Sequence, residues 1–225
     1  MNVLALSGSP RRRWNTELIL EHAVQGALTA GSAHSEIVRL YPMNYSGCIG
    51  CYACKQKGQP SSLCRLKDPL TPVLEKAQEA DVLLLATPVY FFGESAGTRA
   101  FIERLLYPWT AFNADGYGSR SPKPICAGLI YTLAGTEQSV QEHGHQHFNE
   151  STDLFFSLHF ARHECLIAYE TLHTEDYGKL ELNVFDPVAR KKSREERFPA
   201  DCAQAHALGE SLALQAKEII RGPGS

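Results

Sequence analysis

The sequence MNVLALSGSPRRRWNTELIL, residues 1–20, predicts a strand, a loop and a helix, which is how an α/β fold begins. Its apolar run at residues 3–6 is typical of a buried parallel strand and ends in Ser-Gly-Ser-Pro. Three arginines follow, and apolar residues at helical spacing begin soon after them. Hydroxyls, backbone N–H groups and a helix N-terminus together favour an anion. The stretch therefore predicts a phosphate site at the end of the first strand, with a plain turn and solvated arginines as the alternative.

Apolar runs and helical patterns alternate along the rest of the chain, which predicts a doubly wound α/β fold. We expect one domain, residues 1–225, with a five-stranded parallel sheet and helices on both faces. The expected strands are residues 2–7, 35–40, 81–87, 124–133 and 164–170. The expected helices are residues 14–30, 69–80, 95–106, 137–160 and 200–220. Two loop insertions, 41–68 and 107–123, and a frayed tail, 221–225, complete the expected organisation.

Composition excludes several classes of protein. The net charge of −3 gives no sign of a nucleic-acid partner. No stretch approaches the roughly 20 apolar residues that span a bilayer, so we expect no membrane partner. The N-terminus lacks the pattern of a secretory leader, which predicts a cytoplasmic location. The seven cysteines are then expected to be thiols, ligands or core residues rather than disulfides.

Two further loops follow strands at the edge where doubly wound sheets bind ligands. The sequence TPVYFFGESAG, residues 87–97, offers a proline, three aromatic side chains and backbone amides, which suit a flat, partly apolar ring. Core packing of these aromatics is the alternative. The sequence TLAGTEQ, residues 132–138, contains a glycine that allows a ligand close to the backbone. The three loops together predict one ligand with a phosphate and a ring.

Three motifs, SGSPRRRWNT (7–16), CIGCYAC (48–54) and ATPVYFFGESAGTRAFIERL (86–105), resemble the flavodoxin-like NAD(P)H-dependent FMN reductases, including the iron–sulfur flavoproteins. The resemblance implies a flavodoxin-like fold that binds FMN, with the flavin as the reactive group and no catalytic side chain. It implies phosphate contacts from Ser7, Ser9, Arg11, Asn15 and Thr16. It implies ring contacts from Pro88, Val89, Tyr90, Phe91, Phe92, Leu133, Ala134 and Gly135.

Two functions follow from this resemblance. The first is an FMN-dependent NAD(P)H oxidoreductase that passes a hydride in a ping-pong cycle to a small acceptor such as a quinone, a flavin or a nitroaromatic. The alternative is an iron–sulfur flavoprotein that transfers electrons between a ferredoxin-type donor and FMN. The flavin of this family usually lies at a subunit contact, which predicts a homodimer or homotetramer. Four aromatic residues of the second insertion are expected at that contact: Tyr107, Trp109, Phe112 and Tyr117.

The first insertion contains four cysteines. Cys48, Cys51 and Cys54 are spaced C-x2-C-x2-C, and Cys64 follows after nine residues. Four thiolates at such spacing can bind a 4Fe-4S cluster, as the resemblance implies, or zinc. Free thiols at a subunit contact are the third possibility. The other three cysteines are expected to be buried as small apolar residues: Cys126, Cys165 and Cys202.

Two polar segments are interpreted as surface features. The sequence HGHQH, residues 143–147, is expected to be solvated or to face a subunit, with a metal site as the alternative. The charge run ARKKSREER, residues 189–197, is expected to be a solvated segment, with attraction of the extra phosphate of NADPH as the alternative.

Overall fold

The computed structural model describes residues 1–32, 34–58 and 60–222. Its main sheet has the strand order β2-β1-β3-β7-β8, and all four pairings along this path are parallel. The strands are β1 (Asn2–Ser7), β2 (His34–Arg39), β3 (Val82–Tyr90), β7 (Cys126–Thr132) and β8 (Arg162–Ala168). The predicted five-stranded, doubly wound sheet is therefore confirmed, and a two-residue strand, β4 (Gly93–Glu94), adds an antiparallel pair to β3.

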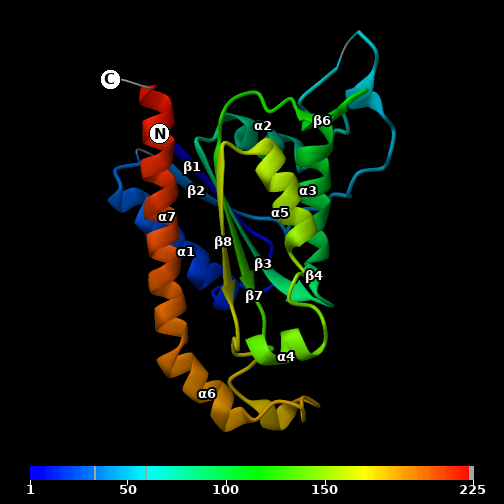
Figure 1. The fold of residues 1–225 in the computed structure, drawn as a ribbon. Coiled ribbons are helices and arrows are strands. Elements are labelled where there is room, and N and C mark those ends of the chain that lie inside the picture. Colours follow the sequence, from blue (N-terminus) through cyan, green and yellow to red (C-terminus); the bar gives the residue numbers. More distant parts are fainter. Residues whose placement is uncertain (33, 59, 223–225) are drawn as a thin grey trace.

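Helices cover both faces of this sheet (Figure 1). The helices α1 (Asn15–Thr29) and α7 (Phe198–Arg221) pack on one face. The helices α2 (Thr71–Glu79), α3 (Ala96–Trp109) and α5 (Glu150–His159) pack on the other. Successive strand residues alternate between the two cores: Leu84 lies in the first and Leu85 in the second. Both are fully buried, as a central parallel strand requires.

Two predicted segments have a different structure. The single helix expected at residues 137–160 is two helices, α4 (Glu137–Glu142) and α5, because Gly144 adopts a φ of 71° and interrupts the helical backbone. The expected loop at residues 107–123 begins as the last turn of α3 and continues as a hairpin, β5 (Thr110–Asn113) and β6 (Gly116–Ser119). Trp109 is fully buried against Phe160, so its prediction as a contact-surface residue is wrong.

The charge run at residues 189–197 is also more ordered than expected. It forms most of α6 (Pro187–Glu196), whose N-terminus is capped by Asp186 through its Oδ1 and the N–H of Val188 at 2.9 Å. Arg190 in this helix is buried, which contradicts the prediction of a wholly solvated segment. The predicted frayed tail is ordered helix at Arg221, and its last three residues, 223–225, lie outside the described residues.

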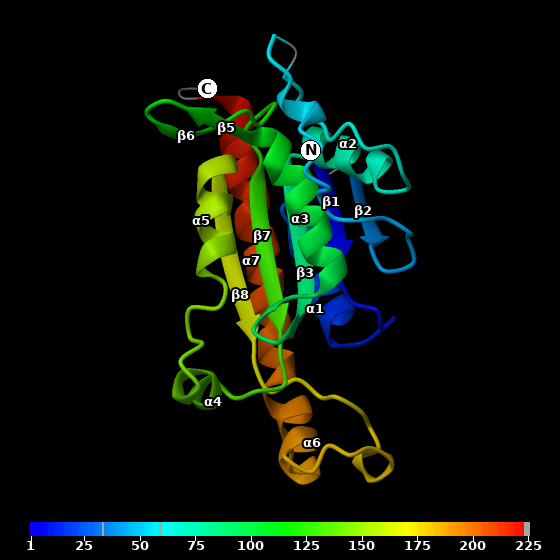
Figure 2. The ribbon, with the colours of Figure 1, turned by 90° about the vertical axis from the view of Figure 1, so that its right-hand side faces the viewer.

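The parallel strands end near α4 and α6, at the lower end of the molecule in Figures 1 and 2. We call this end the carboxyl edge. The cysteine loop, residues 41–68, reaches the opposite end, where its cyan tip projects beside the β5–β6 hairpin. A short 3-10 helix, Ala53–Lys55, is its regular element among the residues described. Nowhere in the described part of the chain is a helix both long enough and apolar enough to cross a membrane.

Candidate functional site

Two neighbouring cavities lie at the carboxyl edge. The phosphate cavity, about 160 Å³, is lined by residues that include Ser9, Arg11, Asn15, Thr16, Pro88 and Tyr90. The ring cavity, about 630 Å³, is lined by residues that include Phe91, Phe92, Gly135 and Arg190. Val89, Leu133 and Ala134 line both, so the two cavities share a wall. The fold thus brings together every residue that the sequence assigned to the flavin except Ser7, which is buried in β1 and lines neither cavity.

The phosphate cavity has the features of an anion site. It lies at the N-terminus of α1, where the cap residue Trp14 makes no capping hydrogen bond with its side chain. The first amides of a helix lack partners within the helix and carry partial positive charge. The Ser9 hydroxyl accepts the Arg11 N–H at 3.1 Å, and the Arg11 guanidinium lies 4.3 Å from the centre of the Trp14 ring. These groups fit a phosphate.

Gly8 fixes the position of the loop at residues 7–16, which we call the phosphate loop. Its N–H donates to the Ala86 carbonyl at 2.8 Å, and its own carbonyl accepts the Ser95 hydroxyl at 2.7 Å. A Cβ atom at this position would lie 1.7 Å from Thr98 Oγ1. Only glycine allows the loop to approach α3 this closely. Ser95 therefore ties the phosphate loop to the start of α3.

Two of the predicted phosphate ligands have other partners. The Asn15 side chain donates from Nδ2 to the Leu172 carbonyl at 2.8 Å and accepts at Oδ1 from Arg194 at 3.0 Å. The Thr16 hydroxyl lies 2.7 Å from that of Thr132, which links α1 to β7. With these side chains engaged, the donors left for a phosphate are the Arg11 guanidinium and the first backbone N–H groups of α1, which have no partners within the helix.

A segment outside the predicted loops completes the site. We call residues 169–197 the strap. Its Leu172 carbonyl also accepts the Trp14 Nε1–H at 3.0 Å, and its His173 carbonyl accepts from Arg11 at 2.5 Å. Sequence reasoning missed these residues because backbone carbonyls carry no sequence signal. It also missed Arg190 and Arg194, although their charge run was visible, because their helix packs against the site rather than facing only water.

The ring cavity is bounded by a strained turn. Val89 and Tyr90 pair with β4 residues, so Phe91 and Phe92 form a two-residue hairpin loop with φ values of 50° and 57°. Asn and Gly are the usual residues there, and a bulky residue in the left-handed region costs about 1–2 kcal/mol. The Phe91 side chain is fully exposed, whereas Phe92 stacks on His145 at 3.7 Å. Strain retained beside a cavity is typical of a functional loop.

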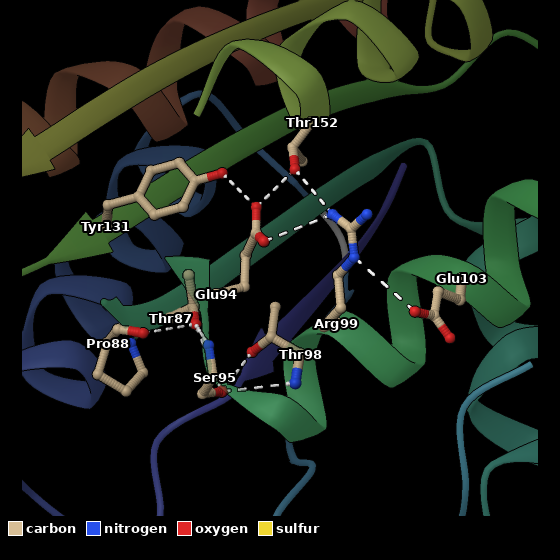
Figure 3. Close-up of polar contacts among 9 residues, drawn as sticks. All are labelled: Thr87, Pro88, Glu94, Ser95, Thr98, Arg99, Glu103, Tyr131 and Thr152. Atoms are coloured by element: carbon tan, nitrogen blue, oxygen red, sulfur yellow. Dashed lines mark hydrogen bonds and ion pairs between the residues drawn. The ribbon is translucent and has the colours of Figure 1, made fainter. Parts of the chain in front are cut away.

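A buried carboxylate holds the outgoing end of this turn, as Figure 3 shows. Glu94 accepts hydrogen bonds from Tyr131 Oη at 2.9 Å and from Thr152 Oγ1 at 2.6 Å, and it lies 3.6 Å from the Arg99 guanidinium. The pKa of Tyr131 is strongly raised, first by burial and then by Glu94, so its phenol stays protonated and donates. These contacts anchor the turn to β7, α3 and α5.

The same contacts continue toward the cysteine loop. Arg99 Nε lies 3.8 Å from Glu103 Oε1, one turn further along α3 (Figure 3). Glu103 Oε2 in turn accepts the backbone N–H of Cys48 at 3.1 Å. A connected set of side chains therefore joins the turn at the ring cavity to the first cysteine of the loop.

The four cysteines of the loop line a single cavity of about 20 Å³, which has room for about one water molecule. Cys48 and Cys51 are exposed, whereas Cys54 is buried, and burial raises the pKa of its thiol. Lys55 anchors the loop through Nζ, which donates to the Pro108 carbonyl at 3.1 Å and to the Thr110 carbonyl. Across residues 1–32, 34–58 and 60–222, no three ligating side chains are arranged to hold a metal ion.

The cysteines outside the loop divide into two kinds. Cys126 and Cys202 are buried, as predicted, whereas Cys165 is exposed and its predicted burial is wrong.

Comparison with known proteins identifies the family. The model of the family "NADPH-dependent FMN reductase" matches residues 1–156. The chain belongs to this family. The match contains the phosphate loop, the strained turn and the 132–138 loop, and it ends before the strap. The family assignment therefore rests on the part of the chain that builds most of both cavities.

Curated relatives of this family member are iron–sulfur flavoproteins. One from Methanocaldococcus jannaschii is 36% identical over 104 residues, which is 46% of this chain and 51% of that protein. One from Archaeoglobus fulgidus is 38% identical over 104 residues, 46% of this chain and 48% of that protein. The matches thus span about half the length of each of these relatives.

Solved structures share the flavodoxin-like fold of this reductase family. An NAD(P)H:quinone oxidoreductase from Methanothermobacter marburgensis has a TM-score of 0.64 at 18% identity, over 94% of this chain and 96% of that one. An FMN-dependent NADH-azoreductase from Bacillus anthracis, in complex with FMN, has a TM-score of 0.67 at 11% identity, over 94% and 99%. At such low identity the likeness concerns the fold.

Proposed function

We propose that this chain binds FMN at the carboxyl edge and oxidises NAD(P)H to reduce a small acceptor. The observation that carries the proposal is the pair of cavities with a common wall. One is small, lies at an uncapped helix N-terminus and faces Arg11. The other is large and is lined mainly by apolar groups, including both residues of the strained turn. A phosphate joined to a flat ring fits this pair.

When bound, FMN supplies the two-electron chemistry by accepting a hydride from NAD(P)H and passing the electrons to a quinone, a flavin or a nitroaromatic. The protein binds the FMN and orients its ring. The amides at the start of α1 and the Arg11 guanidinium hold the phosphate, and Pro88, Val89 and Tyr90 lie along the wall toward the ring. The backbone at Ala134 and Gly135 borders the ring cavity, where N–H groups stabilise negative charge.

Identification of the released flavin tests this proposal directly. Flavin extracted from the purified chain should be FMN, and the holoprotein should oxidise NADH or NADPH with an added quinone. Arg11→Gln should weaken FMN binding by about tenfold or more, because a charge-assisted bond contributes roughly 1.5–3 kcal/mol. Arg12→Gln, one position along the same loop and outside both cavities, is the matched control. Extraction of FAD, or no flavin, would contradict the proposal.

A second candidate function rests on the four cysteines that line one cavity. As an iron–sulfur flavoprotein, the chain would hold a 4Fe-4S cluster on Cys48, Cys51, Cys54 and Cys64 and accept electrons from a ferredoxin-type donor. The cavity of about 20 Å³ is far smaller than such a cluster, so the loop would have to open. The names of the curated relatives support this candidate.

Anaerobic purification separates the two candidates. Iron and acid-labile sulfide near four per chain, both lost in Cys51→Ser and kept in Cys165→Ser, would establish the cluster. Cys165 is an exposed cysteine outside the loop and serves as the control. Absence of iron and sulfide from the native protein would leave the NAD(P)H oxidoreductase as the function and the thiols as loop residues.

We further propose a homodimer or homotetramer in the cytoplasm. Aromatic side chains gather at the hairpin end. Phe112 and Tyr117 are exposed with ring centres 5.6 Å apart, and the half-buried Tyr107 has its ring centre 5.8 Å from that of Phe112. Such patches mark contact surfaces. Light scattering of the flavin-loaded protein checks this, and a monomer would contradict it.

A further inference from the structure

Arg190 is a buried cation at the carboxyl edge whose hydrogen-bonding capacity is only partly used. The side chain extends from α6, and the residue is 8% exposed. One guanidinium nitrogen donates to the Ala134 carbonyl at 2.7 Å. Its Nε is buried without a hydrogen-bond partner, and no carboxylate in the described part of the chain forms an ion pair with it.

Two aromatic rings of the strap, Phe185 and His173, lie near Arg190. Its Cζ lies 5.7 Å from the centre of the Phe185 ring, and that ring lies 4.2 Å from the His173 ring. The pKa of His173 is lowered, first by burial and then by Arg190 and Arg11. Within residues 1–32, 34–58 and 60–222, no carboxylate lies within ion-pair distance of this guanidinium, and a buried charge without a partner is costly for the protein alone. A negatively charged group in the cavity would remove that cost.

The position of Arg190 indicates which group this is. Arg190 lines the ring cavity, and the residue that accepts its hydrogen bond, Ala134, forms the wall shared by both cavities. Its guanidinium thus lies where the proposed function places the edge of the flavin ring. This inference rests on that proposed function and deepens it.

We propose that Arg190 stabilises the negative charge that the flavin ring gains on reduction, and so binds reduced FMN more tightly than oxidised FMN. The hydride brings one hydrogen and two electrons from NAD(P)H, NAD(P)⁺ departs, and the ring gains one negative charge without release of a proton. The guanidinium is buried and already held in the wall by the Ala134 carbonyl, so it needs no rearrangement to face that charge, as in an oxyanion site.

Paired binding measurements test this role. The apoprotein is titrated with oxidised FMN and, under anaerobic conditions with excess dithionite, with reduced FMN. Arg190→Gln should weaken binding of reduced FMN at least tenfold more than binding of oxidised FMN. That difference corresponds to a fall of about 30 mV in the two-electron midpoint potential of the bound flavin. Arg190→Lys should retain most of the preference, and Lys191→Gln, an exposed neighbour on the same helix, should leave both affinities unchanged.

A purely structural role gives a different result. If Arg190 only ties α6 to the Ala134 carbonyl, Arg190→Gln weakens both forms of FMN equally, and the proposal is wrong. An unchanged pair of affinities overturns it as well. Failure of the native apoprotein to bind either form of FMN would instead refute the proposed function itself, so the two failures are distinguishable.

A measurement on the native holoprotein removes the dependence on a variant that folds. A cation beside the reduced ring keeps it ionised to lower pH. The absorbance of the reduced flavin should therefore show ionisation at least one pH unit below that of free reduced FMN, which is a tenfold effect. Ionisation at the same pH as free reduced FMN, or higher, would overturn the proposal.

Discussion

The two ends of the sheet hold their candidate sites in different ways. At the carboxyl edge, the phosphate loop is fixed by hydrogen bonds of the Gly8 backbone with the Ala86 carbonyl and the Ser95 hydroxyl, and the turn at the ring cavity is fixed by the buried Glu94. At the other end, the cysteine loop is held to α3 by side chains. The buried Arg104 donates to the Leu66 carbonyl at 2.8 Å and pairs with Asp68, and Glu103 accepts the N–H of Cys48. The first site is tied to strands of the sheet itself, β3 and β7, whereas the second is tied to α3, a helix outside the sheet. Flavin binding should therefore be insensitive to changes in the cysteine loop.

The largest effect is expected at Gly8, where the carboxyl edge is most tightly packed. Gly8→Ala places a Cβ 1.7 Å from Thr98 Oγ1, so the phosphate loop must move. Overpacking of this kind costs about 3 kcal/mol and should abolish measurable FMN binding. Chemical denaturation and flavin titration measure both effects.

Two variants test the cause of that loss. Adding Thr98→Ala removes the clashing oxygen and leaves 3.1 Å as the closest side-chain approach, so the double variant should regain part of the stability. Gly93→Ala is the control, because its Cβ would come no closer than 3.8 Å to another atom outside its own neighbours. Equal losses in Gly8→Ala and Gly93→Ala would refute the packing argument.

The second-largest effect is expected at Glu94, which is linked through Arg99 to Glu103 at the other end of the molecule. Comparing substitutions of the two glutamates shows whether the two ends act independently. Glu94→Gln removes the charge that two hydroxyls and Arg99 share, which should lower stability by about 2–3 kcal/mol and weaken FMN binding several-fold. Glu103→Gln changes a half-exposed group at the cysteine loop and should alter stability by less than about 0.5 kcal/mol. Its effect should be faster reaction of Cys48 with a thiol reagent. Weaker FMN binding in Glu103→Gln would show that the two ends are coupled.

The extent to which the sequence predicts the fold and the site residues also differs between the two ends. The apolar runs place the five strands within a few residues, because central parallel strands leave little ambiguity. The phosphate loop and the TPVYFFG stretch are local motifs, and all of the residues that the sequence assigned to the flavin in them, except Ser7, line the two cavities.

The parts that sequence reasoning missed depend on contacts between distant segments. Leu172 meets Asn15 across 157 positions, and Arg194 meets it across 179. Neither contact has a local pattern. The turn sequence NADG, residues 113–116, was a local signal for the β5–β6 hairpin, but the aromatic residues around it favoured a loop at a subunit contact. Arg190 belongs to a charge run that the sequence shows plainly. Its burial could not be predicted, because it depends on how α6 packs against the rest of the protein.

A smaller effect should follow from a buried acid near the strap. Burial raises the pKa of Asp201, in the first turn of α7, to about 6 from an ordinary 3.8. The unfolded chain therefore loses this proton at lower pH than the folded chain does, so Asp201 destabilises the fold increasingly as pH rises from about 4 to about 6, and by a constant amount at higher pH. Asp201→Asn should raise stability by about 1–2 kcal/mol at pH 8 and have no such effect at pH 4.

The matched variant for this acid lies at the other end of the molecule. Asp115→Asn, in the exposed hairpin turn, should leave the pH dependence of the melting temperature unchanged. A gain in Asp201→Asn that is the same at pH 4 and pH 8 would show that the ionisation of this carboxyl is not the cause.

The smallest effect concerns backbone strain. Replacing a phenylalanine with asparagine should raise stability at the carboxyl edge and lower it at the hairpin end. Phe91 is fully exposed with a φ of 50°, so Phe91→Asn loses little packing and relieves the left-handed strain, which should raise stability by about 0.5–1 kcal/mol. Phe112 lies in β5 between the rings of Tyr107 and Tyr117, so Phe112→Asn should lower stability by about 1 kcal/mol. Thermal melts of the two variants, side by side, measure the difference. Because Phe91 borders the ring cavity, its replacement should also weaken FMN binding, whereas Phe112→Asn should not. A stabilised Phe91→Asn protein with unchanged FMN affinity would mean that the strain is retained for some purpose other than holding the flavin.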